Sequence, residues 1–204
     1  VAVSAAAFAA LTADGRKQLT AGGVQTTSGT SVASYARAKT ISVGAAQASG
    51  VVVLHDDSFD GNLATITGET GETIDGSLGG TFLEHFDLTI DYPGKKLHLA
   101  PYQDTSFIVD PAELVGFALG TSVSTGYAVA SVFSGSDAEA KGVAAGDIVT
   151  AVDGQSIASL STSQIAVLMG GPVGSTKSVT FGAAKSLANQ SVDIKVEELL
   201  PLPK

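Results

Sequence analysis

The stretch Ser134-Gly-Ser-Asp-Ala-Glu-Ala-Lys-Gly-Val-Ala-Ala-Gly-Asp-Ile-Val-Thr-Ala-Val-Asp-Gly-Gln-Ser-Ile157 places its glycines, charges and apolar residues in an order that specifies local structure. Ser136 or Asp137 is suited to cap a short helix, because a short oxygen-bearing side chain accepts hydrogen bonds from free N–H groups there. Gly142 suits the left-handed position after that helix, and Asp153-Gly154 suits a two-residue hairpin turn. The stretch therefore predicts a helix, a turn, a strand and a hairpin.

The same order resembles that of a PDZ domain. The matching elements are a strand Ala128–Phe133, a helix Asp137–Lys141, a Gly turn, and Gly146-Asp-Ile-Val149 leading into a half-buried strand that ends at Val152. A generic α+β domain is the alternative interpretation. The resemblance implies that a peptide adds as an extra strand to a sheet edge while backbone N–H groups capture its terminal carboxylate.

The residues of the peptide site follow from the same resemblance. The carboxylate loop is expected at residues 114–117, with the edge strand running from Phe117 to Leu119. A helix over Thr162–Met169, which has apolar residues on one face, would form the second wall, although some of that face must belong to the core. An ordinary strand entry is the alternative for the loop. The expected peptide-binding residues are Leu114, Val115, Gly116, Phe117, Leu119, Gln164, Ile165 and Leu168.

Composition narrows the classes of partner. The chain has 204 residues, 44% of them hydrophobic, a formal charge of -9 and no Cys. This describes a soluble chain of one or two domains, and two are expected. No apolar run approaches the roughly 20 residues that span a membrane, and eleven basic residues against twenty acidic ones leave no basic face for nucleic acid. The absence of Cys excludes disulfides and thiolate metal sites.

The first 13 residues, Val1 to Ala13, have two interpretations. The segment is apolar and rich in small residues, as the remnant of a signal peptide would be. It also fits a short strand followed by a helix over Ala5–Leu11 that Ser4 caps. The second interpretation is preferred, because the segment has neither a basic start nor a Met.

Residues 20–101 are typical of a small all-β domain, with strands expected near Val32–Val43, Val51–Leu54, Asp87–Asp91 and Lys96–Leu99. Within it, Ile74-Asp-Gly-Ser-Leu-Gly-Gly-Thr-Phe-Leu-Glu-His-Phe-Asp-Leu-Thr-Ile-Asp-Tyr-Pro-Gly-Lys-Lys-Leu-His-Leu99 resembles the closing segment of retropepsin-like aspartic proteases. The resemblance implies that Leu78 and Gly79 belong to a loop crossing behind a catalytic aspartate, although Ser77 departs from the apolar residue expected there. It also implies a substrate-covering flap with its tip at Thr27, Ser28, Gly29, Thr30 and Ser31.

Catalysis in that family uses two carboxylates that share a proton, each from an Asp-Thr-Gly or Asp-Ser-Gly turn. The four Asp-Gly pairs of this chain, at positions 14, 60, 75 and 153, have the wrong order, so no residue is assigned as catalytic. The resemblance places the aspartate immediately upstream of Val1 and implies that two such domains pair, as a homodimer or with a second copy. The alternative is a scaffold that binds without the aspartate.

Metal and cofactor chemistry are not expected. The three His residues lack the spacing of a helical metal site, and His55-Asp56-Asp57 is interpreted as a solvated turn after a strand. The segment Gly170-Gly-Pro-Val-Gly174 follows a predicted helix and is interpreted as the end of that helix. No serine nucleophile motif is present.

The sequence thus predicts a mainly β chain with short helices. A partial retropepsin-like β-barrel would occupy residues 1–101, a linker 102–111, and a PDZ domain, a small α+β barrel, 112–204. The expected function is aspartic-type peptide hydrolysis combined with binding of peptide C-termini; a non-catalytic PDZ adaptor is the alternative. The resemblance further implies a periplasmic or secreted setting, no cofactor, and a protein or peptide partner.

Overall fold

The computed structural model describes residues 1–26, 29–104, 113–183 and 186–203. The chain divides into two compact units, one of Val1–Gln18, Ser34–Ile108 and Pro201–Lys204, the other of Leu19–Ala33 and Val109–Leu200. The helices are α1 Ala5–Thr12, α2 Asp57–Thr70, α3 Gly80–Leu83, α4 Asp137–Ala140 and α5 Thr162–Met169. The strands are β1 Ala2–Val3, β2 Gln18–Thr26, β3 Gly29–Arg37, β4 Thr40–Val43, β5 Ala46–Ser49, β6 Val52–Asp56, β7 Gly76–Ser77, β8 Phe86–Asp91, β9 Lys96–Pro101, β10 Glu113–Leu114, β11 Phe117–Val123, β12 Gly126–Val132, β13 Ile148–Val152, β14 Gln155–Ser156, β15 Thr176–Phe181, β16 Ser191–Lys195 and β17 Glu197–Glu198.

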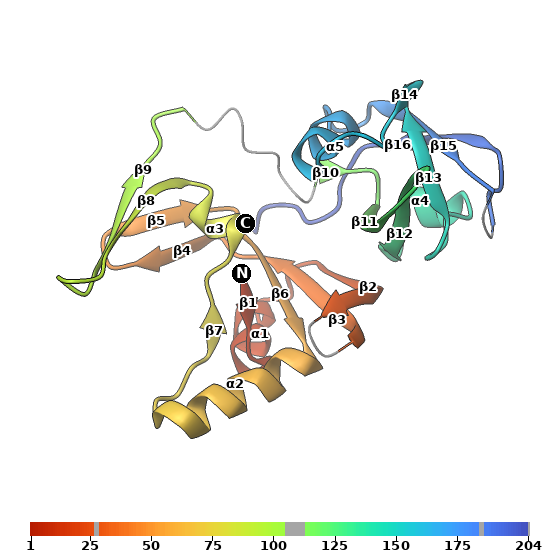
Figure 1. Cartoon of the computed structure of the whole chain (residues 1–204). Helices are drawn as coiled ribbons and strands as arrows, with labels where there is room; N and C mark the ends of the chain where they lie inside the picture. Colours follow the sequence, from red (N-terminus) through yellow and green to blue (C-terminus); the bar gives the residue numbers. More distant parts are fainter. Residues whose placement is uncertain (27–28, 105–112, 184–185, 204) are drawn as a thin grey trace. The chain divides into compact units, whose positions relative to one another are not determined.

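A five-stranded sheet in the order β2-β3-β6-β1-β7 organises the N-terminal part of the chain (Figure 1). Its short central strand β1 runs parallel to β6, with Ala2 opposite Leu54, and antiparallel to β7, with Ala2 opposite Ser77. A Cβ on Gly76 would lie 2.9 Å from the Ala2 carbonyl oxygen, so glycine at this position allows β7 to approach β1 closely.

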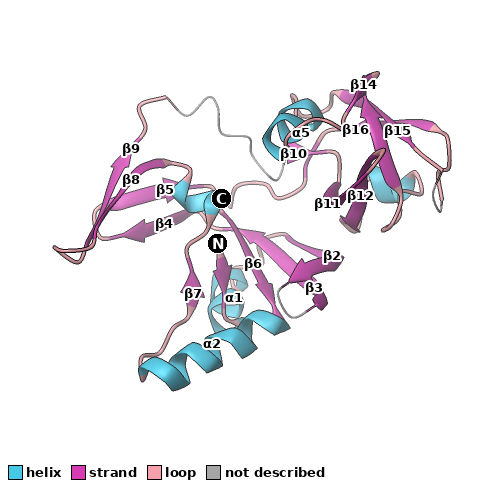
Figure 2. Cartoon of the chain, in the orientation of Figure 1, coloured by secondary structure: helices cyan, strands magenta, loops and turns pink. Residues whose placement is uncertain are grey.

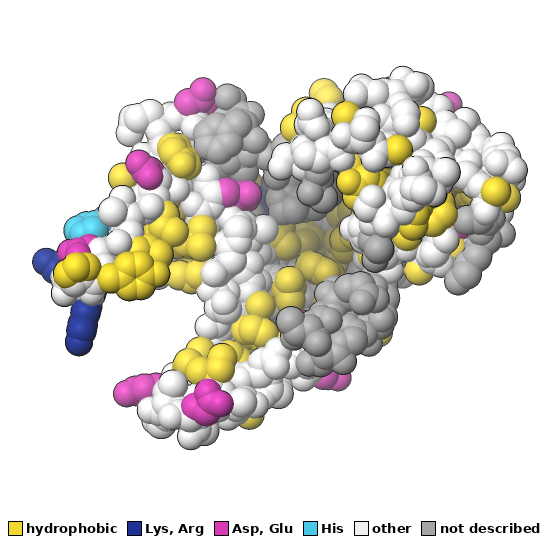
Figure 3. All heavy atoms as spheres, in the orientation of Figure 1, with side chains coloured by type: hydrophobic (Ala, Val, Ile, Leu, Met, Phe, Trp, Pro, Cys, Tyr) yellow, Lys and Arg dark blue, Asp and Glu magenta, His cyan; other side chains and the backbone are white. Residues whose placement is uncertain are grey.

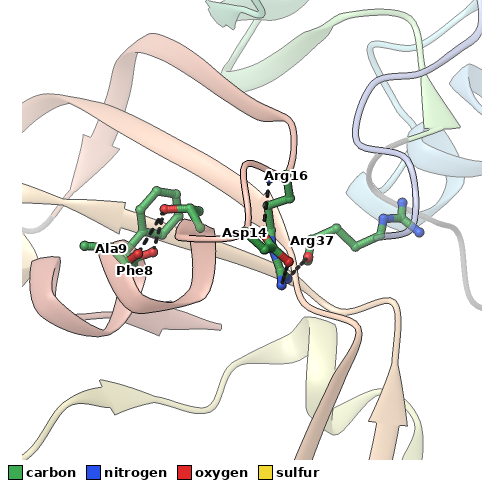
Figure 4. A network of polar contacts seen from close by, with 6 residues as sticks. Phe8, Ala9, Asp14, Arg16 and Arg37 are labelled. Atoms are coloured by element: carbon green, nitrogen blue, oxygen red, sulfur yellow. Dashed lines mark hydrogen bonds and ion pairs between the residues drawn. The ribbon is translucent and has the colours of Figure 1, made fainter. Parts of the chain in front are cut away.

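Helix α1 follows β1 as the sequence predicts. The Ser4 hydroxyl accepts a hydrogen bond from the Ala7 N–H at 3.2 Å, which caps the helix, and Phe8 is its buried residue. After the helix, the Arg16 guanidinium contacts Asp14 at 2.7 Å and donates to the Arg37 carbonyl at 2.7 Å (Figure 4). These bonds tie the end of the helical segment to β3.

Helix α2 corrects the sequence analysis, which predicted only a solvated turn at residues 55–57 in an all-β domain. Asp56 is the N-cap: one carboxylate oxygen accepts the N–H groups of Ser58 at 2.9 Å and Phe59 at 3.1 Å. Gly71, with φ 74°, ends the helix in the left-handed conformation. The segment is rich in Gly and Thr, which have low helix propensity, and only Leu63 is buried, so its periodicity is weak.

Two hairpins, β4–β5 and β8–β9, each form a separate two-stranded sheet in the first unit. The second hairpin confirms the predicted one, with Leu88 opposite Leu99 and Ile90 opposite Leu97. Because barrel closure needs continuous pairing around the sheet, the predicted β-barrel is wrong for the described residues of both units, whose sheets stay open.

The second unit contains a sheet in the order β11-β12-β13-β15-β16, with β14 on β13 (Figure 2). Strands β10 and β17 form a separate pair. Strand β12, helix α4, strand β13 and helix α5 confirm the predicted elements. Asp153 and Gly154 both have positive φ, 50° and 77°, as the predicted two-residue turn requires.

The cores of the two units differ in size. Among its described residues, the second unit contains a large cluster of buried side chains: Val115, Phe117, Val129, Ala138, Val143, Val149, Val152, Ile157, Ile165, Met169, Val179, Phe181, Ile194 and Val196. The described residues of the first unit contain two smaller clusters, one of Phe8, Ala36, Ala38 and Val53, the other of Ala48, Val51, Phe82 and Phe86. Hydrophobic side chains also lie on the surface of hairpin β8–β9 (Figure 3), where Ile90 is 51% exposed. None of the helices in the described residues has the length and apolarity that a membrane crossing requires.

Candidate functional site

The loop between β10 and β11 is anchored by side chains that are buried in the core, which leaves part of its backbone to face outward. The side chains of Val115 and Phe117 are fully buried in the core of the second unit, where the Phe117 ring lies 6.5 Å from that of Phe181. Between them, Gly116 has φ +78°, a conformation that favours glycine. Two buried anchors therefore fix a loop whose central residue turns the chain sharply.

Close packing against Ser136 also requires glycine at position 116. A Cβ at this position would lie 2.5 Å from the Cβ of Ser136 and 2.7 Å from its hydroxyl oxygen. Ser136 is itself buried, so it has little room to move. Both the backbone conformation and the packing exclude a side chain at this point of the loop.

The carbonyl of Gly116 points into the protein. It accepts hydrogen bonds from the Phe133 N–H at 2.9 Å and from the Ser136 hydroxyl at 3.2 Å. Because the peptide bond is trans, the N–H of Phe117 points in the opposite direction. The loop thus aims an N–H group away from β12.

Strand β11 provides an edge beside this N–H. It is first in the sheet order, and within the described residues its partner is β12 alone. Phe117 lies opposite Val132, and the bond from Phe133 to Gly116 makes them a non-hydrogen-bonded pair. In such a pair the N–H and C=O of Phe117 both face the open side of the strand, where an added strand would find a donor and an acceptor.

Helix α5 starts with a capping box. The Ser161 hydroxyl accepts from the Gln164 N–H at 3.3 Å, while the Gln164 side-chain oxygen accepts from the Ser161 N–H at 2.9 Å. Ile165 is 3% exposed and belongs to the core. Leu168 is partly buried against that core, as Leu119 of β11 is. A hollow of about 390 Å³ runs along the exposed side of the helix, lined by Gln155, Leu160, Ser163, Gln164, Val167 and Leu168.

The predicted peptide-binding residues therefore have different positions. The loop residues Val115 and Phe117 contribute backbone, since their side chains lie in the core. Leu114 pairs with Glu197 through the β10–β17 backbone, and its side chain lies outside the described residues. Sequence reasoning identified Ser136 only as a possible helix cap. It also did not identify Val167 of α5, or Gln155 and Leu160, as lining residues of the hollow, because that position depends on tertiary packing.

The first turn of α4 is fixed by charged groups. The Asp137 carboxylate accepts the Lys141 ammonium at 2.8 Å and the Lys195 N–H at 2.8 Å, and the Asp137 N–H donates to a Glu197 carboxylate oxygen at 2.7 Å. Burial acts to raise the pKa of Asp137, but the hydrogen bonds and charges of Lys141 and Lys195 outweigh it and lower the pKa below its usual value.

Buried Asp147 joins two loops of the second unit. One carboxylate oxygen accepts the Ala144 N–H at 2.9 Å, and the other accepts the Ser186 N–H at 2.8 Å. Asp147 itself is 1% exposed, whereas Ala144 is half-buried and Ser186 is exposed, so a buried carboxylate holds two loops that lie nearer the surface. Asp147 therefore has a structural role in the predicted Gly146-Asp147 sequence.

The residues predicted for a protease site lie in the N-terminal part. Thr27 and Ser28 of the predicted flap lie outside the described residues, whereas Gly29, Thr30 and Ser31 begin strand β3. Leu78 is 36% exposed, and Gly79 is the N-cap of α3. A hollow of about 410 Å³ beside Leu78 is lined mainly by apolar side chains, among them those of Val3 and Ile41.

Metal binding has no support in the described part of the chain, where no three His, Asp, Glu or Cys residues are grouped to hold an ion. The Nδ1 atom of His55 lies 3.2 Å from the Val3 carbonyl oxygen, and its ring lies 5.9 Å from that of Phe8. His55 is thus half-buried beside β1, and its Nε2 atom lies 3.7 Å from the exposed carboxylate of Asp57.

Comparison with known proteins identifies one domain, in the C-terminal part of the chain. Residues 106–182 match the sequence model of the PDZ domain. This part of the chain is a PDZ domain, and PDZ domains bind peptides. A search of curated proteins finds no match to the chain. The family match does not include residues 1–101, and the retropepsin-like interpretation of these residues stays a prediction.

Proposed function

We propose that the PDZ domain binds the C-terminus of a partner protein by strand addition to β11. The peptide carboxylate would bind at loop 114–117, and the peptide chain would run along β11 opposite α5. The observation that carries this proposal is the orientation of the peptide group between Gly116 and Phe117. Its carbonyl is held inward by two hydrogen bonds, which leaves the Phe117 N–H aimed at the open edge.

The surroundings of the loop support the same proposal. Leu119 and Leu168 are apolar and partly buried, so they suit contact with an apolar side chain of the peptide. The loop and the strand from Leu114 to Val123 contain no Lys or Arg. A carboxylate there would depend on backbone N–H groups, as in other carboxylate-binding nests.

The test uses two pools of decapeptides whose last four positions are random, one with free carboxylates and one with C-terminal amides. We expect the full chain to retain members of the first pool and to bind the same sequences at least tenfold more weakly as amides. Equal retention of both pools would contradict carboxylate capture. No retention from either pool would contradict peptide binding at a free C-terminus.

A second candidate function is peptide hydrolysis by paired aspartates, with the PDZ domain recruiting the substrate. The strand order β6-β1-β7 supports it, because it brings residues 77–79 beside the start of β1, as the retropepsin resemblance implies. A Cβ on Gly79 would lie 3.7 Å from the Val1 nitrogen. Helix α3 and hairpin β8–β9 then follow in the order of the family's closing segment.

The test for this candidate starts from the full-length gene product. We expect an Asp-Thr-Gly or Asp-Ser-Gly turn before Val1, a peptidase activity at acid pH that pepstatin inhibits, and loss of the activity when that Asp is changed to Asn. Absence of the turn, or a folded dimer without activity, would leave the PDZ domain as the functional part.

A further inference from the structure

The hydroxyl of Ser136 makes two hydrogen bonds with different roles. As the N-cap of α4 it accepts the Glu139 N–H at 3.2 Å. Its own hydrogen goes to the Gly116 carbonyl at 3.2 Å. The first bond stabilises the helix, and the second acts on the loop 20 residues earlier in the chain.

The bond to Gly116 fixes the direction of a peptide group. With its carbonyl held by Ser136 and by the Phe133 N–H, the peptide group between Gly116 and Phe117 cannot rotate without breaking both bonds. Rotation would turn the Phe117 N–H away from the open edge. Ser136 is buried, so water cannot readily replace its hydroxyl as the donor.

The first turn of α4 also holds the other end of the loop. The Asp137 N–H donates to the Glu197 carboxylate at 2.7 Å, and the backbone of Glu197 pairs with Leu114 in the β10–β17 sheet. The loop is thus attached to α4 at Gly116 directly and at Leu114 through β17. Helix α4 therefore holds the loop at two of its residues.

We propose that Ser136 is a positioning residue for the peptide site, which orients the Phe117 N–H toward the terminal carboxylate through the Gly116 carbonyl. The proposal rests on the proposed C-terminal peptide binding. It assigns to a buried serine outside the groove a part in recognising the carboxylate, while the side-chain preferences of the groove depend on β11 and α5.

The test compares Ser136→Ala and Ser136→Thr with Glu139→Ala in the full chain. Glu139→Ala is the matched control: it removes the bond from the Gly135 N–H to the Glu139 carboxylate in the same turn of α4, and it leaves the Ser136 hydroxyl in place. The probe is the tightest decapeptide from the random pool, measured with a free carboxylate and with an amide.

We expect Ser136→Ala to weaken binding of the free-carboxylate peptide about tenfold and to leave binding of the amide nearly unchanged. Ser136→Thr, which keeps the hydroxyl, and Glu139→Ala, which leaves Ser136 in place, should both retain the preference for the carboxylate. The backbone amide resonance of Phe117 should shift in Ser136→Ala and not in Glu139→Ala.

The outcomes separate the two proposals. A wild-type chain that does not prefer the carboxylate contradicts the proposed function itself. A wild-type chain that prefers it, together with a folded Ser136→Ala variant of unchanged preference, contradicts the positioning role alone. Should Ser136→Ala not fold, Ser136→Thr decides: a folded Thr variant with an unchanged Phe117 resonance and full preference supports the role of the hydroxyl, and one that loses the preference contradicts it.

Discussion

Replacement of Gly116 by Ala tests the geometry of the carboxylate loop most directly. The new Cβ would lie 2.5 Å from the Ser136 Cβ in a backbone with φ +78°. Left-handed backbone costs an Ala residue about 1–2 kcal/mol, and overpacking of a buried site costs about 1–3 kcal/mol. We therefore expect a loss of about 2–5 kcal/mol in the free energy of unfolding of the second unit.

Gly154→Ala is the matched control for this substitution. Gly154 has φ +77°, and a Cβ there would meet no atom within 4 Å, so only the backbone cost of about 1–2 kcal/mol applies. Urea denaturation followed by circular dichroism gives both free energies, and fluorescence anisotropy with the selected decapeptide gives the affinities. The control should bind as the wild type does, and Gly116→Ala should not. The reasoning is refuted if both variants lose equal stability and bind the peptide equally well.

The remaining predictions concern stability. Asp147→Asn keeps one acceptor oxygen at a buried position and leaves the N–H of Ala144 or of Ser186 without its carboxylate partner, so urea denaturation should show a loss of about 1–3 kcal/mol. A loss below about 0.5 kcal/mol would contradict the structural role of the carboxylate. Asp137 and Asp153 have pKa values below the usual one, and for Asp153 the main cause is the hydrogen bond from the Ser178 N–H. Their carboxylates therefore stabilise the fold at pH values above the unfolded pKa near 4. This contribution is lost as the pH falls through the pKa values of the folded state. The urea midpoint should therefore fall below about pH 4, less steeply in Asp153→Asn; an identical slope would argue against this role. Phe82→Ala, at a fully buried site of the first unit, should cost about 3–5 kcal/mol by the same assay.

Sequence reasoning was most successful where residues act through local backbone chemistry. Caps such as Ser4 and the positive-φ turn at residues 153–154 could be identified from the chain, because their conformations depend on neighbouring atoms alone. Helix α2 was missed because its propensity is low and its boundaries come from Asp56 and Gly71, which also fit a turn.

In the candidate site, too, local backbone features could be predicted and tertiary contacts could not. Gly116 was predicted because glycine has a clear conformational reason to lie in such a loop. The sequence predicted that part of the apolar face of helix 162–169 belongs to the core, but it could not show that Ile165 does, nor that Val115 and Phe117 do. Strand and helix periodicity do not say which apolar face meets which neighbour. The bond from Ser136 to Gly116 joins residues that are distant in sequence, and no local pattern indicates it.

The unequal cores of the two units have a consequence for how the chain responds to heat. In the described residues, the second unit has an apolar cluster of 14 buried residues, among them Phe117, Phe181 and Met169. The first unit has two clusters of four buried residues each, and three of those eight residues are alanines. Less apolar area is buried by an alanine than by a larger side chain, so the first unit has the weaker driving force for folding. Calorimetry of the chain should then show an asymmetric endotherm rather than one symmetric peak, and a single melting temperature would not describe the molecule.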